Sequence, residues 1–139
     1  MFDLLDDFKE IDESKTKSNV RRYLNHNFQR LIDRCGISAN QLQSPKFSDV
    51  PFSKSVSNHS EDNVIRLMEY RELLQYLITA MKTGTDHSIL FDFYVLHYSD
   101  IKIMQELHIS NSTYYSQKNK ELLSFADKII TVADLNIYK

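Results

Sequence analysis

Apolar residues recur at helical spacing along much of the chain and predict long helices. Residues 15–35 carry apolar side chains at steps of three and four, and Gly36 follows where a C-terminal cap belongs. Residues 60–82 carry a broad apolar face, with Ser60 as the predicted N-cap and Gly84 as the predicted stop. Because a broad apolar face must be covered, the second of these helices is expected to form the core and to contribute to dimerisation.

Three further helices are predicted close behind one another. Asp86 is the expected cap of the first, and Ser99 or Asp100 opens the second. A last helix is predicted over residues 110–132, with its first residue as the cap, and only residues 108–109 separate it from the helix before. This order and spacing favour a tri-helical helix-turn-helix.

The stretch between the two long helices has a different composition. Residues 37–59 contain both prolines of the chain and many serines, which predicts an irregular connection. We therefore expect an N-terminal helical arm over 1–36, opened by a short amphipathic helix over 2–10, and a helical domain over 60–139. The helix-turn-helix would occupy about 86–130. With only two glycines in 139 residues, the predicted fold class is all-α.

The predicted helix-turn-helix departs from the usual pattern in three ways, one of which is that Gln117 and Lys118 interrupt the buried stripe of its last helix. Met104 stands where a small residue is usual, and His108 stands where the turn usually has glycine. A plain helical hairpin with solvated polar residues therefore remains an alternative. The apolar residues expected to face the core of this unit are Ile101, Ile103, Met104, Leu107, Ile109, Tyr114, Leu122, Phe125 and Ile129.

The outward side of the last predicted helix carries groups that suit DNA. Its first turns would reach base edges in the major groove, where asparagine can bond adenine and serine or tyrosine can contact bases or phosphates. The lysines would supply charge for the phosphates. The candidate DNA-binding residues are Ser110, Asn111, Ser112, Tyr115, Ser116, Lys118, Asn119 and Lys120.

Charge is distributed unevenly behind a formal net charge of −2. Residues 15–34 are basic, and Arg21, Arg22 and Arg30 are candidates for a second DNA contact; a solvated helix face is the simpler alternative. The start of the chain is acidic instead. Its carboxylates could meet a basic patch on RNA polymerase or a metal, although a solvated face is again favoured; they are Asp3, Asp6, Asp7 and Glu10.

Several function classes are disfavoured by what the sequence lacks. Cys35 is the single cysteine, and the five histidines show no His-x-x-x-His spacing, so no metal site is expected. No glycine-rich phosphate loop and no catalytic constellation is present, so we expect neither a cofactor nor an enzyme. The chain lacks the order of a signal peptide and any span long enough for a bilayer, which predicts a cytoplasmic protein without membrane contact.

Several motifs together resemble one known family. They are the run Ser110–Tyr115 followed by Lys118, Lys120, Leu122, Leu123, Phe125 and Ala126, and upstream Ile11–Thr16, Ser60–Ile65 and the spacing from Ile89 and Leu90 to Tyr98. On these motifs the chain, over about residues 10–130, resembles the ArpU family of phage-type transcriptional regulators. The resemblance implies a C-terminal part similar to the DNA-binding region 4 of sigma factors. Glu121 departs from the family pattern, which usually has alanine there, and is expected to face solvent or to pair with Lys118 or Lys120.

Residue pattern and resemblance together predict a sequence-specific regulator that binds double-stranded DNA and controls transcription. Activation of phage late or lysis genes is implied by the resemblance alone. A homodimer is expected, since two half-sites add their binding energies. Two alternatives remain open: a phage DNA-packaging subunit like a small terminase, which should form a ring, and a helical interaction module without DNA binding.

Overall fold

The computed structural model describes residues 10–37, 42, 61–82 and 88–139, and within these ranges it contains helices and no strand. The helix expected over residues 2–10, most of the expected linker, and the cap and stop residues Ser60, Gly84 and Asp86 lie outside the described residues. The all-α prediction is confirmed for the described part. The helices are α1 (Glu13–Asn25), α2 (Asn27–Cys35), α4 (Glu61–Met81), α5 (Ile89–Tyr94), α6 (Asp100–Leu107) and α7 (Asn111–Lys128).

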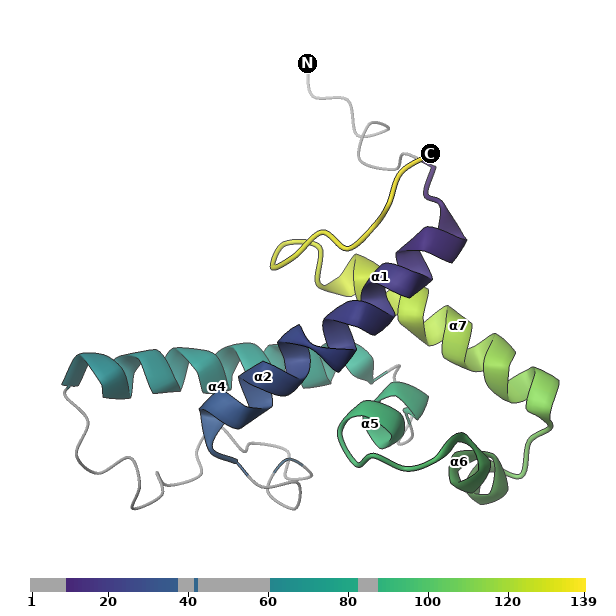
Figure 1. Ribbon diagram of the computed structural model, residues 1–139, viewed down its shortest axis with the longest axis horizontal. Helices are drawn as coiled ribbons and strands as arrows, with labels where there is room; N and C mark the ends of the chain where they lie inside the picture. Colours follow the sequence, from purple (N-terminus) through teal and green to yellow (C-terminus); the bar gives the residue numbers. More distant parts are fainter. Residues whose placement is uncertain (1–9, 38–41, 43–60, 83–87) are drawn as a thin grey trace.

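The helix expected over residues 15–35 is in fact two helices, α1 and α2, which meet at His26. The backbone of His26 closes α1 and opens α2 at φ −116° and ψ −68°. Gln29 supports the junction, because its side-chain amide donates to the carbonyl oxygens of Leu24 at 3.1 Å and Tyr94 at 2.9 Å. The break lets α1 pack on α7 while α2 lies along α4 (Figure 1). Gly36 ends α2 in the left-handed region, at φ 61°, as its position in the sequence predicted.

A single large core joins the helices of the N-terminal arm to the rest. The face of α1 and α2 that the sequence marked as apolar is buried against α4, α5 and α7. The helices of the arm therefore share their core with the C-terminal helices. The fully buried side chains of this core include Val20, Leu24, Phe28, Leu74, Leu77, Met81, Leu90, Leu122, Phe125 and Ile129.

Helix α4 runs over 21 residues, close to the predicted span of 60–82, and its first turns extend beyond the other helices (Figure 1). Its one buried arginine is Arg71, which is 1% exposed. The Nε of Arg71 donates to the carbonyl oxygen of Cys35 at 3.2 Å. A cation at the C-terminus of α2 is favourable, because the last carbonyls of a helix lack partners within it.

A second, smaller core lies among α5, α6 and the start of α7. Ile89, Ile103 and Tyr114 form its buried centre, and Ile109 from the connecting turn packs against them. Ile101 does not belong to this core, contrary to expectation, and is 65% exposed. Ile103 and Leu107 are four residues apart and share the inner side of α6, whereas Ile101 falls outside that stripe.

The end of the chain returns to the start of α1. Helix α7 ends at Lys128 rather than near residue 132, and the following residues form turns and an extended tail. The amide of Asp12 donates to the carbonyl oxygen of Ile137 at 2.7 Å, and the amide of Ile137 donates to the hydroxyl of Thr16 at 2.9 Å. The tail thus lies beside α1, and Figure 1 shows the C-terminus next to the beginning of that helix.

Candidate nucleic-acid interface

Helices α6 and α7 are joined by three residues with a defined backbone. His108 lies in the left-handed region at φ 55° and ψ 44°, and its amide donates to the carbonyl oxygen of Gln105 at 3.3 Å. The amide of Ile109 bonds back to the carbonyl of Met104 at 3.3 Å. Glycine is the usual residue in such a C-terminal cap, because it reaches positive φ without steric cost. His108 therefore adopts the conformation expected of the glycine that it replaces in the usual pattern.

Serine residues cap both helices of this unit as predicted. The Ser99 side chain accepts from the amide of Lys102 at 3.1 Å, so α6 begins at Asp100. The Ser110 side chain accepts from the amide of Thr113 at 3.3 Å and opens α7. The N-cap of α5 is Ser88 and not Asp86 as expected; the Ser88 hydroxyl accepts from the amide of Phe91 at 3.2 Å.

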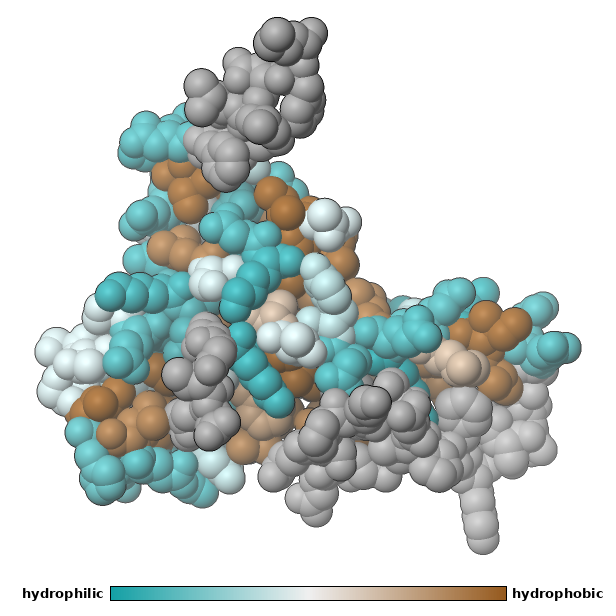
Figure 2. Space-filling view, turned by 180° about the vertical axis from the view of Figure 1, so that it is seen from behind, coloured by the Kyte–Doolittle hydropathy of each residue, from teal (hydrophilic) through white to brown (hydrophobic). Residues whose placement is uncertain are grey.

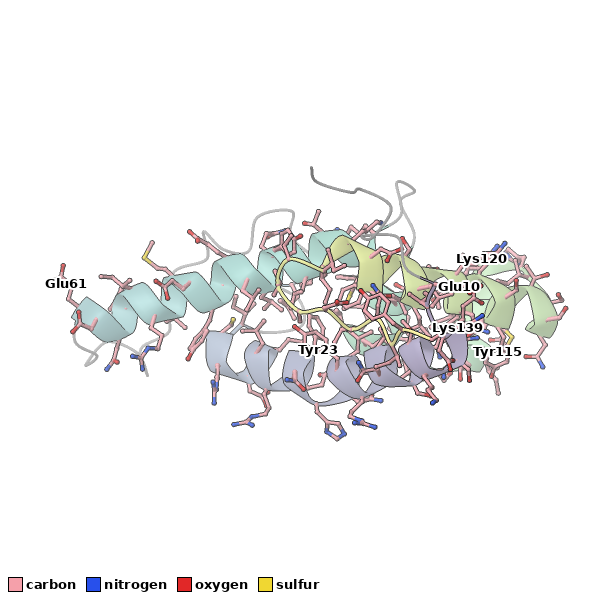
Figure 3. The ribbon with its side chains drawn as sticks, turned by 90° about the horizontal axis from the view of Figure 1, so that it is seen from above. Glu10, Tyr23, Glu61, Tyr115, Lys120 and Lys139 are labelled. Atoms are coloured by element: carbon pink, nitrogen blue, oxygen red, sulfur yellow. The ribbon has the colours of Figure 1, made fainter. Side chains whose placement is uncertain are left out.

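The first half of α7 presents a polar face to solvent. Residues three and four apart share a side of a helix, and exposed residues recur every four positions here while Tyr114, Leu122 and Phe125 face inward. Tyr115 is 43% exposed. Figure 3 shows Tyr115 and Lys120 at one end of the molecule, far from the end of α4 that Glu61 marks. The predicted site residues on this exposed face are Ser110, Asn111, Ser112, Tyr115, Ser116 and Lys120.

Lys118 does not lie on this face, so its expected position is wrong. The side chain is buried, and its Nζ lies 3.0 Å from Oδ1 of Asp100 and 3.6 Å from the centre of the Phe93 ring. Its place in the chain explains this, because Lys118 is four residues after Tyr114 and four before Leu122, both in the buried stripe of α7. Lys118 therefore joins α7 to α6 and α5 instead of offering its charge to solvent.

Asp100 is the hydrogen-bond acceptor where the start of α6 meets α7. Its Oδ1 accepts from the hydroxyl of Tyr114 and from the ammonium of Lys118. Burial by itself would raise the pKa of the Asp100 carboxyl, but the hydrogen bonds from Tyr114 and Lys118 and the charge of Lys118 outweigh it, so the pKa is lowered. Burial and the contact with Asp100 raise the pKa of the Tyr114 hydroxyl. The ion pair and its hydrogen bonds therefore connect the start of α6 to α7.

Glu121 was expected to face solvent or to pair with Lys118 or Lys120, but it is half-buried and its carboxylate lies at the start of α5. Its carboxylate accepts from the hydroxyl of Ser88 at 3.1 Å and from the amides of Ile89 at 3.4 Å and Leu90 at 3.3 Å. The first amides of a helix have no partner within it, and a negative charge is favourable there. An acid on α7 thus caps α5. Sequence spacing alone could not show this, because the two groups are more than 30 residues apart.

The basic residues of the arm fall into two groups. Arg21 donates to the side-chain oxygen of Asn119 at 3.2 Å, which brings α1 to the middle of α7 and leaves Asn119 half-buried. Arg22 is exposed, and Arg30 lies instead at a cleft between α2 and α4. In the described part of the chain, none of these three arginines has a carboxylate within 4.0 Å. Only Arg21 is thus brought to α7 by a direct contact.

Other kinds of site find no support in the described residues. These contain no group of three or more acidic, histidine or cysteine side chains placed to hold a metal ion. Cys35 is buried, and burial raises the pKa of its thiol to about 11, so the thiolate that a nucleophile needs is scarce. Among the helices described, none has the length and apolar character needed to cross a bilayer.

Comparison with known proteins places the chain in a family. Residues 55–125, half of the chain, match the family described as "Protein of unknown function (DUF1492)". The chain is also 27% identical over 123 residues to a protein of Enterococcus hirae provisionally named autolysin regulatory protein ArpU; the match covers 86% of this chain and 89% of the relative. No solved structure matches. The chain therefore belongs to the DUF1492 family and is ArpU-like over most of its length.

Proposed function

We propose that the chain binds double-stranded DNA, with α6 and α7 as a helix-turn-helix and the first half of α7 as the recognition helix. The observation that carries the proposal is the polar, solvent-exposed side of α7 from Ser110 to Lys120. A small core behind it, centred on Ile103 and Tyr114, holds the two helices at a fixed angle. A recognition helix must be open on one side and rigidly supported on the other.

Phosphate contacts would come from the groups around this face. Lys120 is exposed on α7, and Lys102 is exposed on α6. Arg21 lies beside Asn119 and could reach the backbone of a duplex lying along α7. The start of α7, which Ser110 opens, is also a favourable place for a phosphate, because the helix dipole attracts negative charge there. Lys118 is left out of this set, because its ammonium is buried with Asp100.

The cellular role proposed for this binding is control of transcription. It is supported by the name of the Enterococcus hirae relative as a regulatory protein and by the resemblance of the Ser110–Tyr115 region to the ArpU pattern. Activation of phage late or lysis genes follows from that resemblance. RNA polymerase is proposed as a further partner for the acidic start of the chain, and the cytoplasm as the place of action. In this role the chain acts by binding and not by catalysis.

A homodimer is part of the proposal. The N-terminal part of α4 presents apolar side chains to solvent: Ile65 is 49% exposed and Met68 is 50% exposed. Figure 2 shows apolar surface at this end of the molecule. Large apolar side chains exposed next to each other are favourable to bury against a second copy, and a dimer would present two recognition helices to two half-sites.

Fluorescence anisotropy with a labelled duplex from the region upstream of the neighbouring genes tests the proposal. Lys120→Ala should weaken binding to every duplex and lower the slope of log K against log salt by about one, because one phosphate contact is lost. Asn111→Ala should reduce the preference for the upstream duplex over a shuffled one by roughly 1–3 kcal/mol, because a base contact is lost.

Lys139→Ala is the matched control. Lys139 is exposed, and its ammonium lies 3.4 Å from the carboxylate of Glu10. Figure 1 shows this end of the chain beside the start of α1, apart from the start of α7. This variant should bind as the unaltered chain does. Binding that is as strong after Lys120→Ala as after Lys139→Ala, at all salt concentrations, would contradict the proposed placement of the duplex.

A further inference from the structure

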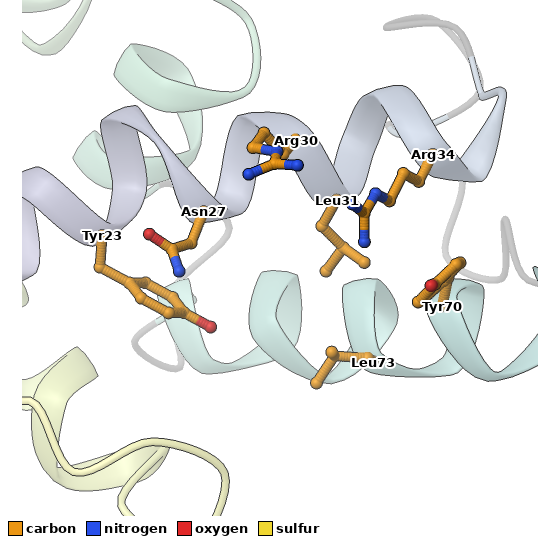
Figure 4. Close-up of a pocket in the computed structure, with 7 residues that line it drawn as sticks. All are labelled: Tyr23, Asn27, Arg30, Leu31, Arg34, Tyr70 and Leu73. Atoms are coloured by element: carbon orange, nitrogen blue, oxygen red, sulfur yellow. The ribbon is translucent and has the colours of Figure 1, made fainter.

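A cleft between α2 and α4 has no part in the proposed DNA contact. Its volume is about 270 Å³, and residues of α1, α2 and α4 line it (Figure 4). Tyr23 closes it at the end toward α1, and Tyr70 lies at the other end. Small-molecule sites usually have about 300–1,000 Å³, so this cleft suits a small ligand.

The charged groups that line the cleft are two arginines, which only donate hydrogen bonds. Arg30 and Arg34 are one helical turn apart on α2, and both point over the cleft together with the amide of Asn27 (Figure 4). Among the described residues that line it, none is acidic. Within the part of the chain that the structure describes, neither arginine has a carboxylate within 4.0 Å. Two unpaired guanidinium groups that share a cleft favour a carboxylate or a phosphate group, which such forks bind with two hydrogen bonds each.

The rest of the lining is apolar or aromatic. Leu31 is buried and Leu73 is half-buried, and the two face each other across the cleft (Figure 4). The guanidinium carbon of Arg34 lies 5.8 Å from the centre of the Tyr70 ring, which holds the arginine at the rim. Between two leucines and two tyrosine rings, a flat apolar body is favourable and a fully hydrated ion is not.

We propose that this cleft binds a small organic anion made of one ring and one carboxylate or phosphate group. The charged group lies between Arg30 and Arg34, and the ring lies over Leu31 and Leu73. This use of Arg30 replaces the DNA contact considered for it from the sequence. The proposal stands on the cleft alone and is independent of DNA binding by α7.

Amide chemical shifts of the ¹⁵N-labelled full chain, titrated with benzoate and with phenyl phosphate, test the proposal. At least one of the two should shift the amides of residues 27–34 and 70–73 saturably, and which one does so assigns the carboxylate or the phosphate. Arg34→Gln should weaken that binding by about tenfold or more, because a charged hydrogen bond is lost. Arg22→Gln changes an exposed arginine outside the cleft and should leave binding unchanged.

Benzyl alcohol serves as the uncharged match of benzoate and should bind at least about tenfold more weakly than the best anion. The proposal is overturned if neither anion shifts these amides at millimolar concentration, or if Arg34→Gln binds as tightly as Arg22→Gln. Equal binding of benzyl alcohol overturns it as well, because the arginines would then have no role. Weaker DNA binding by Arg34→Gln, without any shift by the small anions, would assign the arginines to DNA instead.

Discussion

His108 holds a backbone conformation that costs free energy for any residue with a Cβ atom. Its φ of 55° places it in the left-handed region, where glycine is favoured. His108→Gly should therefore raise the free energy of unfolding by up to about 1 kcal/mol, even though glycine loses more entropy on folding. Urea denaturation measures this. A loss of stability would show that the histidine side chain makes a contribution larger than the backbone strain.

Asp100 should make the stability of the fold sensitive to acid. Its pKa is lowered in the folded chain, so the folded state binds fewer protons than the unfolded state near that pKa. The contribution is present above the ordinary value of 3.8 and is lost as the pH falls through the lowered folded value. Asp100→Asn should thus be less stable than the unaltered chain at neutral pH, and the difference should shrink as the pH falls below about 4.

Glu106→Gln provides the comparison for the acid dependence, because Glu106 is an exposed acid on α6. Chemical denaturation at several pH values, from about pH 2 to neutral pH, measures the free energy of unfolding of the three proteins. The control should follow the unaltered chain at every pH. A constant difference between Asp100→Asn and the unaltered chain would mean that the carboxyl is not linked to folding through its contacts with Tyr114 and Lys118.

The burial of Lys118 could be predicted from the sequence, whereas its pairing with Asp100 could not. Lys118 falls four residues from Tyr114 and four from Leu122, so the spacing of the apolar stripe already placed it on the inner side of α7. A lysine is rarely buried without a partner, and the general rule therefore favoured an exposed position. The carboxylate of Asp100 that makes burial favourable comes from another helix, and this contact depends on how α6 packs on α7.

At the scale of the elements, the start of α5 lies against a carboxylate from another helix. Helix α5 has only six residues, and the carboxylate of Glu121 on α7 accepts from the amides at its start. Glu121→Ala should lower the free energy of unfolding by about 1–3 kcal/mol, because buried amides lose their acceptor. Thermal and urea denaturation measure the change. Glu72→Ala, at an exposed position on α4, is the control and should stay within about 0.5 kcal/mol of the unaltered chain.

Should Glu121→Ala be as stable as Glu72→Ala, water would be replacing the carboxylate at the start of α5, and the capping role would be refuted.

The boundaries of the helices show which features the sequence can predict. Helix α4 and the serine caps of α6 and α7 were predicted because periodicity and capping are local. The break at His26 was not, because it arises where α1 and α2 pack on different partners.

At the scale of the whole molecule, the C-terminal tail packs beside α1, near the other end of the described chain. Leu135 is buried in the main core, and the carbonyl oxygens of Leu135 and Ile137 accept bonds from α1 and the residue before it. Ending the chain after Asp134 should lower the free energy of unfolding by at least about 2 kcal/mol, because a buried leucine and several hydrogen bonds are lost. Amide exchange in α1 should become faster.

Removal of Lys139 alone serves as the control for this truncation, since its side chain is exposed. Equal stability of the two truncated chains would show that the tail contributes nothing to the fold.

The C-terminal tail makes contacts that were not predicted from the sequence. Its residues lack the helical spacing, and its partners on α1 lie more than 110 residues away, so no local signal links them.

The central claim is that the outward side of α7 enters a DNA groove. The most direct measurement is a map of amide chemical shifts for the full chain, with and without its upstream duplex. The account predicts that the largest changes lie in residues 108–120, with smaller ones near Arg21 and none along the exposed end of α4. Large changes confined to α4 or the cleft beside α2, with residues 108–120 unaffected, would contradict it.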